Sequence, residues 1–372
     1  MGSGETAPTM ARVHRTLFDR LGEAVVPAVI LDTPYGFQEN ADQLSARTVE
    51  FFATSVGRPV AVASYRRRDI DGVIAATAVA RLREARYVMA GPGSPSYALR
   101  QWVDGPIPDI IRTKLLTDGI VVMASAAALT LGVVTIPVYE IYKVGEEPRW
   151  LEGLDLLGST TGLRAAVVPH FDNAEGGNHD TRFCYMGQRR LRILEDQLPS
   201  ETFILGVDSH TALVMDLDRR VASVVGLGGV TVRARGRGTV FPSGSEVPIE
   251  ALGEVAHDLA AGRDVTIGWD PGPALDGAPG EATDPSDGRD LVALHDAANR
   301  AEGEFLDALA RSDVRAAVGV VLDLEAAVSG RLRAGEDSPD LDSASATLQS
   351  LILRLGESAE RGAQDPRELP GP

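Results

Sequence analysis

The fold class is decided by the stretch Ala24-Val-Val-Pro-Ala-Val-Ile-Leu31, which Asp32-Thr-Pro-Tyr-Gly36 follows. An uninterrupted apolar run of this length is typical of a parallel strand that is buried on both faces. A helix is predicted directly after it, over residues 41–54, and a second helix over 73–85. Further apolar runs predict strands over 59–64, 87–90, 119–124, 165–169 and 203–207. Strands that alternate with helices predict an α/β fold with a doubly wound, mostly parallel sheet.

The rhythm of the sequence changes after Thr211. Closely spaced strands over 212–215, 220–225 and 229–232 predict an antiparallel edge, and a helix follows over 248–261. We expect the α/β domain to span 1–268 and a Pro/Gly/Asp-rich linker to span 269–288, because this stretch has no apolar period. Stripes such as Val314, Val318, Val321 and Leu322 predict a small helical domain over 289–364, with a tail over 365–372.

Composition limits the classes of function. The chain has 372 residues and a net charge of −17, an excess of carboxylates that disfavours nucleic-acid binding by the α/β domain. No run of 18 apolar residues occurs, so no membrane partner is expected. Residues 1–5 have neither a basic nor an apolar segment typical of a secretion signal, and Cys184 is the one cysteine. These features indicate a cytoplasmic protein, and no cofactor is expected.

Ser125 is the sharpest candidate for chemistry. It lies where the apolar run 120–124 ends and an Ala/Leu-rich helix over 126–131 begins. A strand-to-helix turn exposes a hydroxyl at the edge of a sheet, beside the backbone N–H groups of a helix N-terminus. A helix N-cap serine without a catalytic role is the alternative for this position.

A serine nucleophile needs a base, and the base needs an acid that orients it. His170 ends the predicted strand over 165–169 and is the natural base. Glu140, in Val138-Tyr-Glu-Ile-Tyr-Lys143, is the candidate acid, although a glutamate on a helix surface has the same pattern. His14, His257 and His295 fall in helical surface patterns, so we expect all three to be solvated.

A metal-dependent hydrolase is a lower alternative. This hypothesis depends on side chains near two predicted strand ends that are hard or borderline metal ligands, the type that binds zinc or manganese. These are His170, Asp172, His179, Asp180, Asp208 and His210. None of them shows a recognised ligand spacing. A thiolate nucleophile is disfavoured because Cys184 lies in a predicted helix and not at a strand-to-helix turn, or elbow, like that of Ser125.

Taken together, the motifs resemble the cyanophycinase and aspartyl dipeptidase family of serine peptidases, which share the class I glutamine amidotransferase-like fold. The resemblance covers about residues 1–235 and depends on the order and spacing of short pieces. These are Gly2-Ser-Gly-Glu5, Gly91-Pro-Gly-Ser94 with Leu99, Ser125-Ala126, Gly153-Leu-Asp-Leu-Leu157, Pro169-His170-Phe171, Arg190-Leu191, and Gly206-Val-Asp208 with Thr211-Ala-Leu213. In the family a strand precedes the first of these pieces, and this strand is expected to be missing from residues 1–372.

The resemblance implies a triad in which Ser125 attacks a carbonyl, His170 moves the proton and Glu140 orients the imidazole. It implies an oxyanion hole made by the N–H groups of Ala126 and Gly93, with Gly91 as the alternative to Gly93. The implied substrate is a small peptide or amide, with an aspartyl or β-aspartyl bond.

Substrate binding is assigned by position to Arg182, Asp172, Asp208 and His210, and Arg182 is suited to pair with a carboxylate. A homodimer is left open.

Two departures from the family pattern leave a second hypothesis open. The family places glycine two residues before and two after the nucleophile, and here Met123 and Ala127 stand at those positions. Because methionine is bulky for a tight turn, a catalytically inactive relative that binds a ligand or partner is the alternative to an enzyme. Ser209 also replaces an acidic residue that the family carries after Asp208.

The C-terminal helices have a weaker resemblance to the C-terminal region of cysteinyl-tRNA synthetases. It rests on Glu304-Phe-Leu-Asp-Ala-Leu309 and on Leu355-Gly-Glu-Ser358. The zinc-binding cysteines and catalytic motifs of those enzymes are missing, so synthetase activity is not implied.

Overall fold

The computed structural model describes residues 1–22, 25–117, 119–173, 179–263, 265, 301, 304–305, 308, 311, 313–333, 344, 347–348 and 351. The chain divides into two compact units, Met1–Asp276 and Gly277–Pro372. The predicted linker over 269–288 and the tail over 365–372 lie outside the described residues, as does most of the stretch over 289–364.

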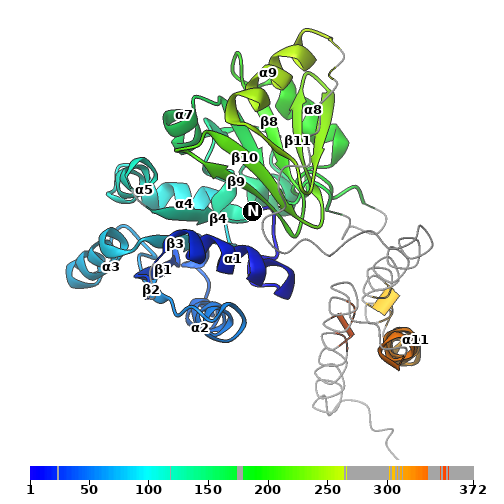
Figure 1. The fold of residues 1–372 in the computed structure, drawn as a ribbon. Coiled ribbons are helices and arrows are strands. Elements are labelled where there is room, and N and C mark those ends of the chain that lie inside the picture. The colour runs from blue at the N-terminus through cyan, green and yellow to red at the C-terminus, as the bar shows by residue number, and fades with distance from the viewer. Residues whose placement is uncertain are drawn as a thin grey trace, which may run out of the picture. The chain divides into compact units, whose positions relative to one another are not determined.

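The first unit contains a four-stranded parallel sheet with the strand order β2-β1-β3-β4 (Figure 1). In its register Val29 lies opposite Ala61 on one side and Val88 on the other, and Val88 lies opposite Val121. The strands are β1 (Ala28–Leu31), β2 (Ala61–Ala63), β3 (Tyr87–Ala90) and β4 (Ile120–Met123). Because β1 and β3 are buried along their whole length, they are apolar at every position, as the sequence indicated.

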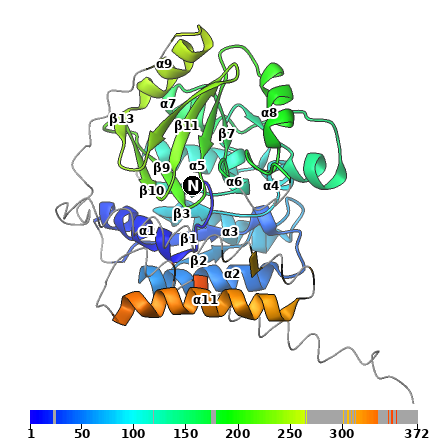
Figure 2. The same ribbon diagram turned by 90° about the vertical axis from the view of Figure 1, so that its right-hand side faces the viewer.

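Helices cover both faces of this sheet (Figures 1 and 2). Ile30 packs in one apolar cluster with α1 (Pro8–Arg20), α2 (Ala41–Phe51) and the π-helix η2 (Phe52–Val56). Leu31 packs in another cluster with α3 (Gly72–Glu84), α4 (Pro95–Trp102) and α5 (Ile107–Leu116). Successive residues of a strand point to opposite faces, so each face has its own helical layer. The predicted doubly wound, mostly parallel α/β sheet is confirmed.

The second half of this unit is largely antiparallel, as predicted after Thr211. Only β7 and β8 pair in parallel in the sheet β12-β11-β8-β7, and a further sheet has the order β13-β10-β9. The strands are β5 (Val134–Thr135), β6 (Leu151–Glu152), β7 (Ala165–Val168), β8 (Phe203–Val207), β9 (Thr211–Asp216), β10 (Val221–Gly226), β11 (Gly229–Ala234), β12 (Arg237–Pro242) and β13 (Glu246–Pro248). The helical elements are η1 (Thr33–Tyr35), α6 (Ala126–Leu129), η3 (Glu140–Val144), α7 (Leu156–Thr161), α8 (Gly187–Asp196) and α9 (Ile249–Ala260).

Two expectations about single segments were wrong. The first strand starts at Ala28 and not at residue 24, because Pro27 has no N–H to donate and Val25 is 80% exposed. His14 was expected to be solvated, but it is fully buried on α1. Its Nδ1 lies 2.6 Å from the Tyr87 hydroxyl, and its Nε2 lies 2.7 Å from the Glu5 carbonyl oxygen. A buried histidine with both nitrogens paired is a core residue.

The second unit contains the helix α11 (Val314–Arg333). Its buried stripe is Ala317, Val321, Leu324 and Val328, whereas Val318 and Leu322 are exposed. α11 lies within the stretch predicted to be helical, and its buried face is rotated from the predicted stripe. No helix in the described part of the chain is long and apolar enough to cross a membrane.

Candidate active site

Ser125 lies at the turn between β4 and α6, in a backbone conformation that few non-glycine residues adopt. Its φ is 50° and its ψ is −121°. Such strain costs of order 1–3 kcal/mol and persists only where the surroundings impose it. The turn is held by hydrogen bonds from the Ala127 N–H to the Gly91 and Ala124 carbonyl oxygens, at 3.2 and 3.0 Å. The strand-to-helix turn expected at Ser125 from the sequence is therefore present.

Met123 and Ala127 do not prevent this turn. Both side chains are buried, with exposed fractions of 4% and 0%, and both pack in the apolar cluster that α4 and α5 cover. Methionine is flexible and fills irregular space in a core, so the core accommodates Met123 beside the turn.

His170 follows β7 and reaches Ser125 across the unit. The distance between Ser125 Oγ and His170 Nε2 is 2.9 Å, within hydrogen-bond range. His170 has a positive φ of 48°, and its carbonyl oxygen accepts a hydrogen bond from the Cys184 N–H at 3.1 Å. The two residues come from different sheets: β4 belongs to β2-β1-β3-β4, and β7 to β12-β11-β8-β7.

A cavity of about 490 Å³ opens beside this pair. Gly93 and Ala126 line it together with Ser125 and His170. No described residue accepts a hydrogen bond from the Gly93 or Ala126 N–H, so both remain available to a ligand. Gly91 does not line the cavity, and it supports the turn through its carbonyl oxygen.

Gly93 is required by a close approach of two backbone segments. Its φ is +136°, and a Cβ atom there would lie 2.0 Å from the Pro34 carbonyl oxygen. The same carbonyl accepts a hydrogen bond from the Ser94 N–H at 2.8 Å. The 91–94 loop is thus fixed against the turn over Thr33–Tyr35.

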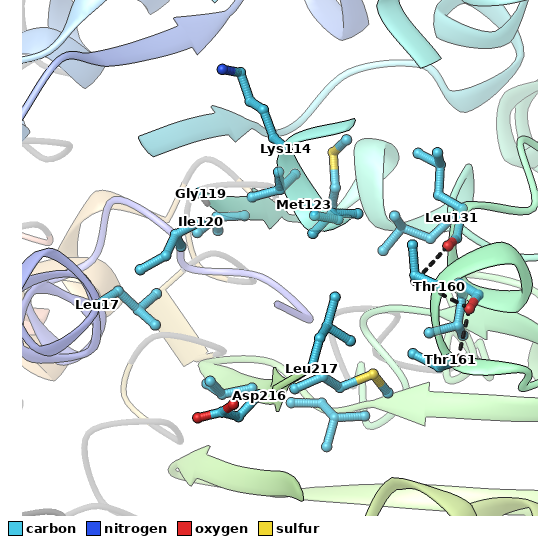
Figure 3. Close-up of a pocket in the computed structure, with 18 of the residues that line it drawn as sticks. Leu17, Lys114, Gly119, Ile120, Met123, Leu131, Thr160, Thr161, Asp216 and Leu217 are labelled. Carbon is cyan, nitrogen blue, oxygen red and sulfur yellow. Dashed lines mark hydrogen bonds between the residues drawn. The ribbon is translucent and has the colours of Figure 1, made fainter. Parts of the chain in front are cut away.

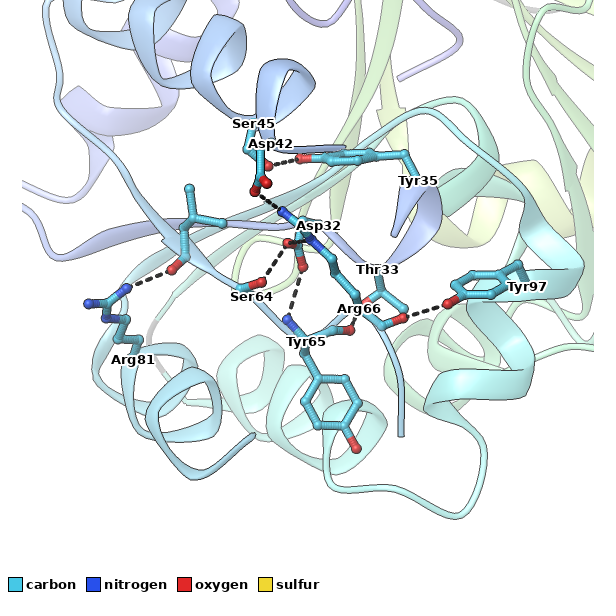
Figure 4. Close-up of polar contacts among 11 residues, drawn as sticks. Asp32, Thr33, Tyr35, Asp42, Ser45, Ser64, Tyr65, Arg66, Arg81 and Tyr97 are labelled. Atoms are coloured by element: carbon cyan, nitrogen blue, oxygen red, sulfur yellow. Dashed lines mark hydrogen bonds and ion pairs between the residues drawn. The ribbon is translucent and has the colours of Figure 1, made fainter. Parts of the chain in front are cut away.

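A network around Asp32 holds that turn (Figure 4). The Asp32 carboxylate is completely buried and accepts hydrogen bonds from Ser64 Oγ at 2.8 Å and from the Tyr65 N–H at 2.9 Å. Arg66 Nε donates to the same carboxylate at 2.8 Å. Thr33 Oγ1 donates to the Tyr65 carbonyl oxygen, which links the turn after β1 to the turn after β2. No local sequence pattern indicates this network, because its members are separated along the chain.

Glu140 begins the π-helix η3, and its Oε1 accepts a hydrogen bond from Ser96 Oγ at 2.5 Å. Its Oε2 is buried and accepts no hydrogen bond from any residue that the structure describes. Ser96 Oγ lies 3.0 Å from Ser94 Oγ, which caps α4 by accepting from the Tyr97 N–H. Glu140 is therefore connected to the segment that carries Gly93.

The four residues assigned to substrate binding do not line this cavity. Arg182 Nε and one terminal nitrogen bind the Asp180 carboxylate at 2.8 and 2.9 Å, and the Arg182 side chain is 53% exposed. Asp172 accepts a hydrogen bond from the Ser209 N–H at 2.7 Å. His210 Nδ1 lies 3.0 Å from Thr9 Oγ1.

Asp208, the fourth of these residues, accepts a hydrogen bond from the Gly229 N–H at 2.8 Å. Burial raises the pKa of Asp208 to about 6; the Gly229 N–H opposes this rise, and the charge of Asp172 adds to it. No group of three or more metal-ligating side chains occurs among the residues that the structure describes, so the metal alternative has no cluster there to rest on.

Several residues that line this cavity were not predicted from the sequence to do so. They are Tyr139, Tyr142, Lys143, Thr181, Cys184 and Tyr185. The helix predicted around Cys184 was wrong, because Phe183, Cys184 and Tyr185 all have positive φ and α8 starts only at Gly187. Burial raises the pKa of the Cys184 thiol to about 12. Lys143 is the one lysine or arginine among the described lining residues.

Comparison with solved structures agrees with this architecture. The chain is similar to a peptidase from an acI-B1 actinobacterium, with a TM-score of 0.54 and 20% identity, covering 67% of this chain and 94% of that one. The fold is peptidase-like. A candidate peptidase E protein from Listeria monocytogenes EGD-e aligns with a TM-score of 0.39 and 11% identity, covering 65% of this chain and 96% of that one. No protein-family model matches the chain, and no curated protein matches it.

Proposed function

We propose that this protein is a serine-type hydrolase that cleaves a peptide or amide bond. The observation that carries the proposal is the 2.9 Å distance between Ser125 Oγ and His170 Nε2 beside a cavity, with Ser125 in a strained elbow. A nucleophile and a base within hydrogen-bond distance are the minimum for this chemistry. An N-cap serine needs neither a positive φ nor a histidine on its hydroxyl.

The chemical steps follow from this pair. His170 Nε2 accepts the proton of the Ser125 hydroxyl as Oγ attacks the carbonyl carbon of the scissile bond. The N–H groups of Gly93 and Ala126 stabilise the negative charge on the carbonyl oxygen. His170 then gives its proton to the leaving amine, and water hydrolyses the acyl-enzyme by the same route. Each step uses a group that lines the cavity.

Glu140 is proposed as the acidic member, with a test that separates two roles. If Glu140 orients His170, the negative charge of its carboxylate is essential, and Glu140→Gln should lower kcat by about 10⁴-fold. If Glu140 only binds Ser96, the glutamine of Glu140→Gln still has an oxygen that accepts the 2.5 Å hydrogen bond. In that case kcat should fall by less than about tenfold. Comparing kcat for Glu140→Gln and Glu140→Ala decides between them.

The proposed substrate is a small peptide with a carboxylate near the scissile bond, as in an aspartyl or β-aspartyl dipeptide. Lys143 supports this because it is the cation among the described lining residues, whereas Arg182 is already bound to Asp180. We expect Lys143→Ala to raise KM for aspartyl dipeptides by about tenfold or more and to leave neutral dipeptides unchanged. Equal effects on both substrates would contradict this role.

A covalent probe tests the proposal before any substrate is known. A fluorophosphonate, which reacts with activated serine hydroxyls, should add one label to the protein, and peptide mass spectrometry should place it on Ser125. Ser125→Ala and His170→Ala should abolish labelling, while the exposed Ser55→Ala should leave it unchanged. Hydrolysis of a dipeptide panel by the same variants, with and without a chelator, should fall by about 10⁴-fold or more without Ser125.

Two other outcomes of these experiments would favour the alternative hypotheses over a serine hydrolase. A folded protein that is not labelled, and that binds panel dipeptides equally with and without the Ser125 hydroxyl, is the inactive relative. Turnover that the chelator removes indicates the metal-dependent alternative.

A further inference from the structure

One wall of the cavity beside Ser125 is aromatic. Tyr139, Tyr142 and Tyr185 line it, which is three of the seven tyrosines in a chain whose residues are only 5% aromatic. We call these three side chains the tyrosine wall. Another cavity of the first unit, of about 390 Å³, is lined mainly by aliphatic side chains such as Leu217, with no aromatic side chain among its described lining residues (Figure 3). The tyrosine wall therefore distinguishes the cavity at the nucleophile from this other apolar cavity.

An irregular helix carries Tyr142 to the wall. Tyr142 lies in the π-helix η3, and single turns of π-helix are frequent at functional sites. The preceding residue, Ile141, is fully buried and anchors the turn, whereas Tyr142 keeps 36% of its surface exposed. The centroids of the Tyr142 and Tyr185 rings lie 5.0 Å apart, and the ring planes are tilted by 36°. The two rings thus form one continuous surface that a ligand in the cavity can reach.

A strained turn fixes Tyr185 beside the proposed base. Phe183, Cys184 and Tyr185 have φ values of 61°, 55° and 67°, a costly backbone that persists only where its surroundings impose it. The Phe183 N–H donates to the Phe171 carbonyl oxygen at 3.0 Å, and the Cys184 N–H donates to the His170 carbonyl oxygen at 3.1 Å. The centroids of the Tyr185 and His170 rings lie 6.3 Å apart. The position of Tyr185 is therefore set relative to His170.

The place of His170 in the reaction indicates which part of a substrate meets the tyrosine wall. In the proposed mechanism His170 gives its proton to the leaving amine, so the residue that carries this amine must pass close to the imidazole. Tyr185 lies beside the imidazole, and Tyr142 lies beside Tyr185. Aromatic rings attract one another in offset or edge-to-face arrangements with centroids about 4.5–7 Å apart. An aromatic side chain on the leaving residue therefore matches this wall.

The charges around the cavity favour a neutral ring over a cationic side chain. An arginine guanidinium can also stack on tyrosine. However, Lys143 is a cation among the described lining residues, and none of these residues is a carboxylate. A cationic leaving residue would meet a like charge without a partner that neutralises it. The volume of about 490 Å³ lies within the range of about 300–1,000 Å³ that is usual for small-molecule sites.

We propose that the tyrosine wall binds an aromatic side chain on the residue whose amine leaves. The preferred substrates are then dipeptides such as Asp-Phe and Asp-Trp, and Asp-Arg is a poor substrate. This inference rests on the proposed hydrolase function, because it uses the delivery of a proton from His170 to the leaving amine. It adds a second element of specificity to the carboxylate recognition assigned to Lys143.

The test compares kcat/KM for Asp-Phe, Asp-cyclohexylalanine and Asp-Arg. Cyclohexylalanine has the size and apolar character of phenylalanine but no π-system. We expect kcat/KM for Asp-Phe to exceed that for Asp-cyclohexylalanine by about fivefold and that for Asp-Arg by about tenfold or more. Tyr142→Leu should reduce the first ratio to below about twofold, and Tyr142→Phe, which keeps the ring, should preserve it.

Phe37→Leu is the matched control. Phe37 is also exposed, at 47%, and its ring centroid lies 5.1 Å from that of Tyr97, but it does not line this cavity. This variant should leave both ratios unchanged. Equal kcat/KM for Asp-Phe and Asp-cyclohexylalanine would overturn the aromatic site and leave the hydrolase standing. A preference for Asp-Phe that Tyr142→Leu leaves intact would overturn the assignment to the tyrosine wall.

Binding of the same dipeptides to Ser125→Ala, measured by isothermal titration calorimetry, separates this inference from the proposed function. If the wild type cleaves none of them but Ser125→Ala binds Asp-Phe about fivefold more tightly than Asp-cyclohexylalanine, the aromatic site is supported and the hydrolase is rejected. If no dipeptide is either cleaved or bound, both are rejected.

Discussion

Arg66 and Asp32 form an ion pair in which Arg66 Nε donates to Asp32 Oδ2 at 2.8 Å. The Asp32 side chain is fully buried, while Arg66 keeps 25% of its side chain exposed. Pro34 lies two residues after Asp32, and its carbonyl oxygen accepts the Ser94 N–H at 2.8 Å. The ion pair is therefore connected through the backbone to the loop that carries Gly93.

Removing the Asp32 carboxylate should destabilise the fold. Asp32→Ala leaves the Tyr65 N–H and the Arg66 guanidinium without their buried acceptor, so we expect the free energy of unfolding to fall by about 3–5 kcal/mol. Urea denaturation measures this change. Asp69→Ala is the matched control, because Asp69 also binds an arginine, Arg67, but is exposed and should leave the midpoint unchanged. Equal losses in both variants would show that burial of Asp32 is not the cause.

Gly93→Ala should impair both stability and catalysis. The added Cβ would lie 2.0 Å from the Pro34 carbonyl oxygen, so the loop must move away from Thr33–Tyr35. Gly93 is a proposed oxyanion donor, and the displacement of one such donor costs about 10²–10³-fold in kcat. Gly145→Ala is the control, since Gly145 also has a positive φ but meets nothing within 4 Å. It should cost about 1 kcal/mol and leave kcat unchanged. Steady-state kinetics of both variants, with Tm, checks this prediction.

Cys184 should be inert although it lines the cavity. Burial raises the pKa of its thiol to about 12, so almost no thiolate forms at pH 8. We expect iodoacetamide to leave the native protein unlabelled and to label it after unfolding in urea. Cys184→Ala should retain fluorophosphonate labelling of Ser125. Rapid alkylation of the native protein with loss of that labelling would instead point to thiol chemistry.

Asp208 should make stability decrease between about pH 4 and pH 6. Its pKa is raised from 3.8 to about 6 in the folded state, so the folded protein binds more protons than the unfolded chain in this interval. Stability therefore falls as pH rises. Asp208→Asn keeps an oxygen for the Gly229 N–H and removes the charge. Tm of the variant should exceed that of the wild type at pH 7.5, and the difference should shrink at pH 4.5; a constant difference would contradict the assignment.

The parts of the fold that depend on local pattern could be predicted from the sequence. β3 and β8 have the predicted bounds, because continuous apolar runs mark strands buried on both faces. The elbow at Ser125 and the position of His170 after β7 could also be predicted, because each follows such a run. The order of strands and helices was enough to place both residues at strand ends.

The remaining features depend on contacts between distant segments. His14 has the pattern of a surface helix residue, yet its ring nitrogens pair with the Glu5 carbonyl oxygen and with the hydroxyl of the distant Tyr87. Arg182 was expected to face a substrate, but its neighbour Asp180 binds it locally. The turn at Cys184 could not be predicted, because three consecutive non-glycine residues with positive φ have no local signature.

Ser125 and His170 follow strands of two sheets that share no described strand, and this has a consequence for heating. Backbone ladders set distances within a sheet, whereas the 2.9 Å contact between Ser125 and His170 depends on how the two sheets pack. Local openings at such a boundary need less free energy than global unfolding. Thermal inactivation should then occur below the temperature at which far-UV circular dichroism changes. The difference between the two temperatures would report how firmly the two sheets are held together.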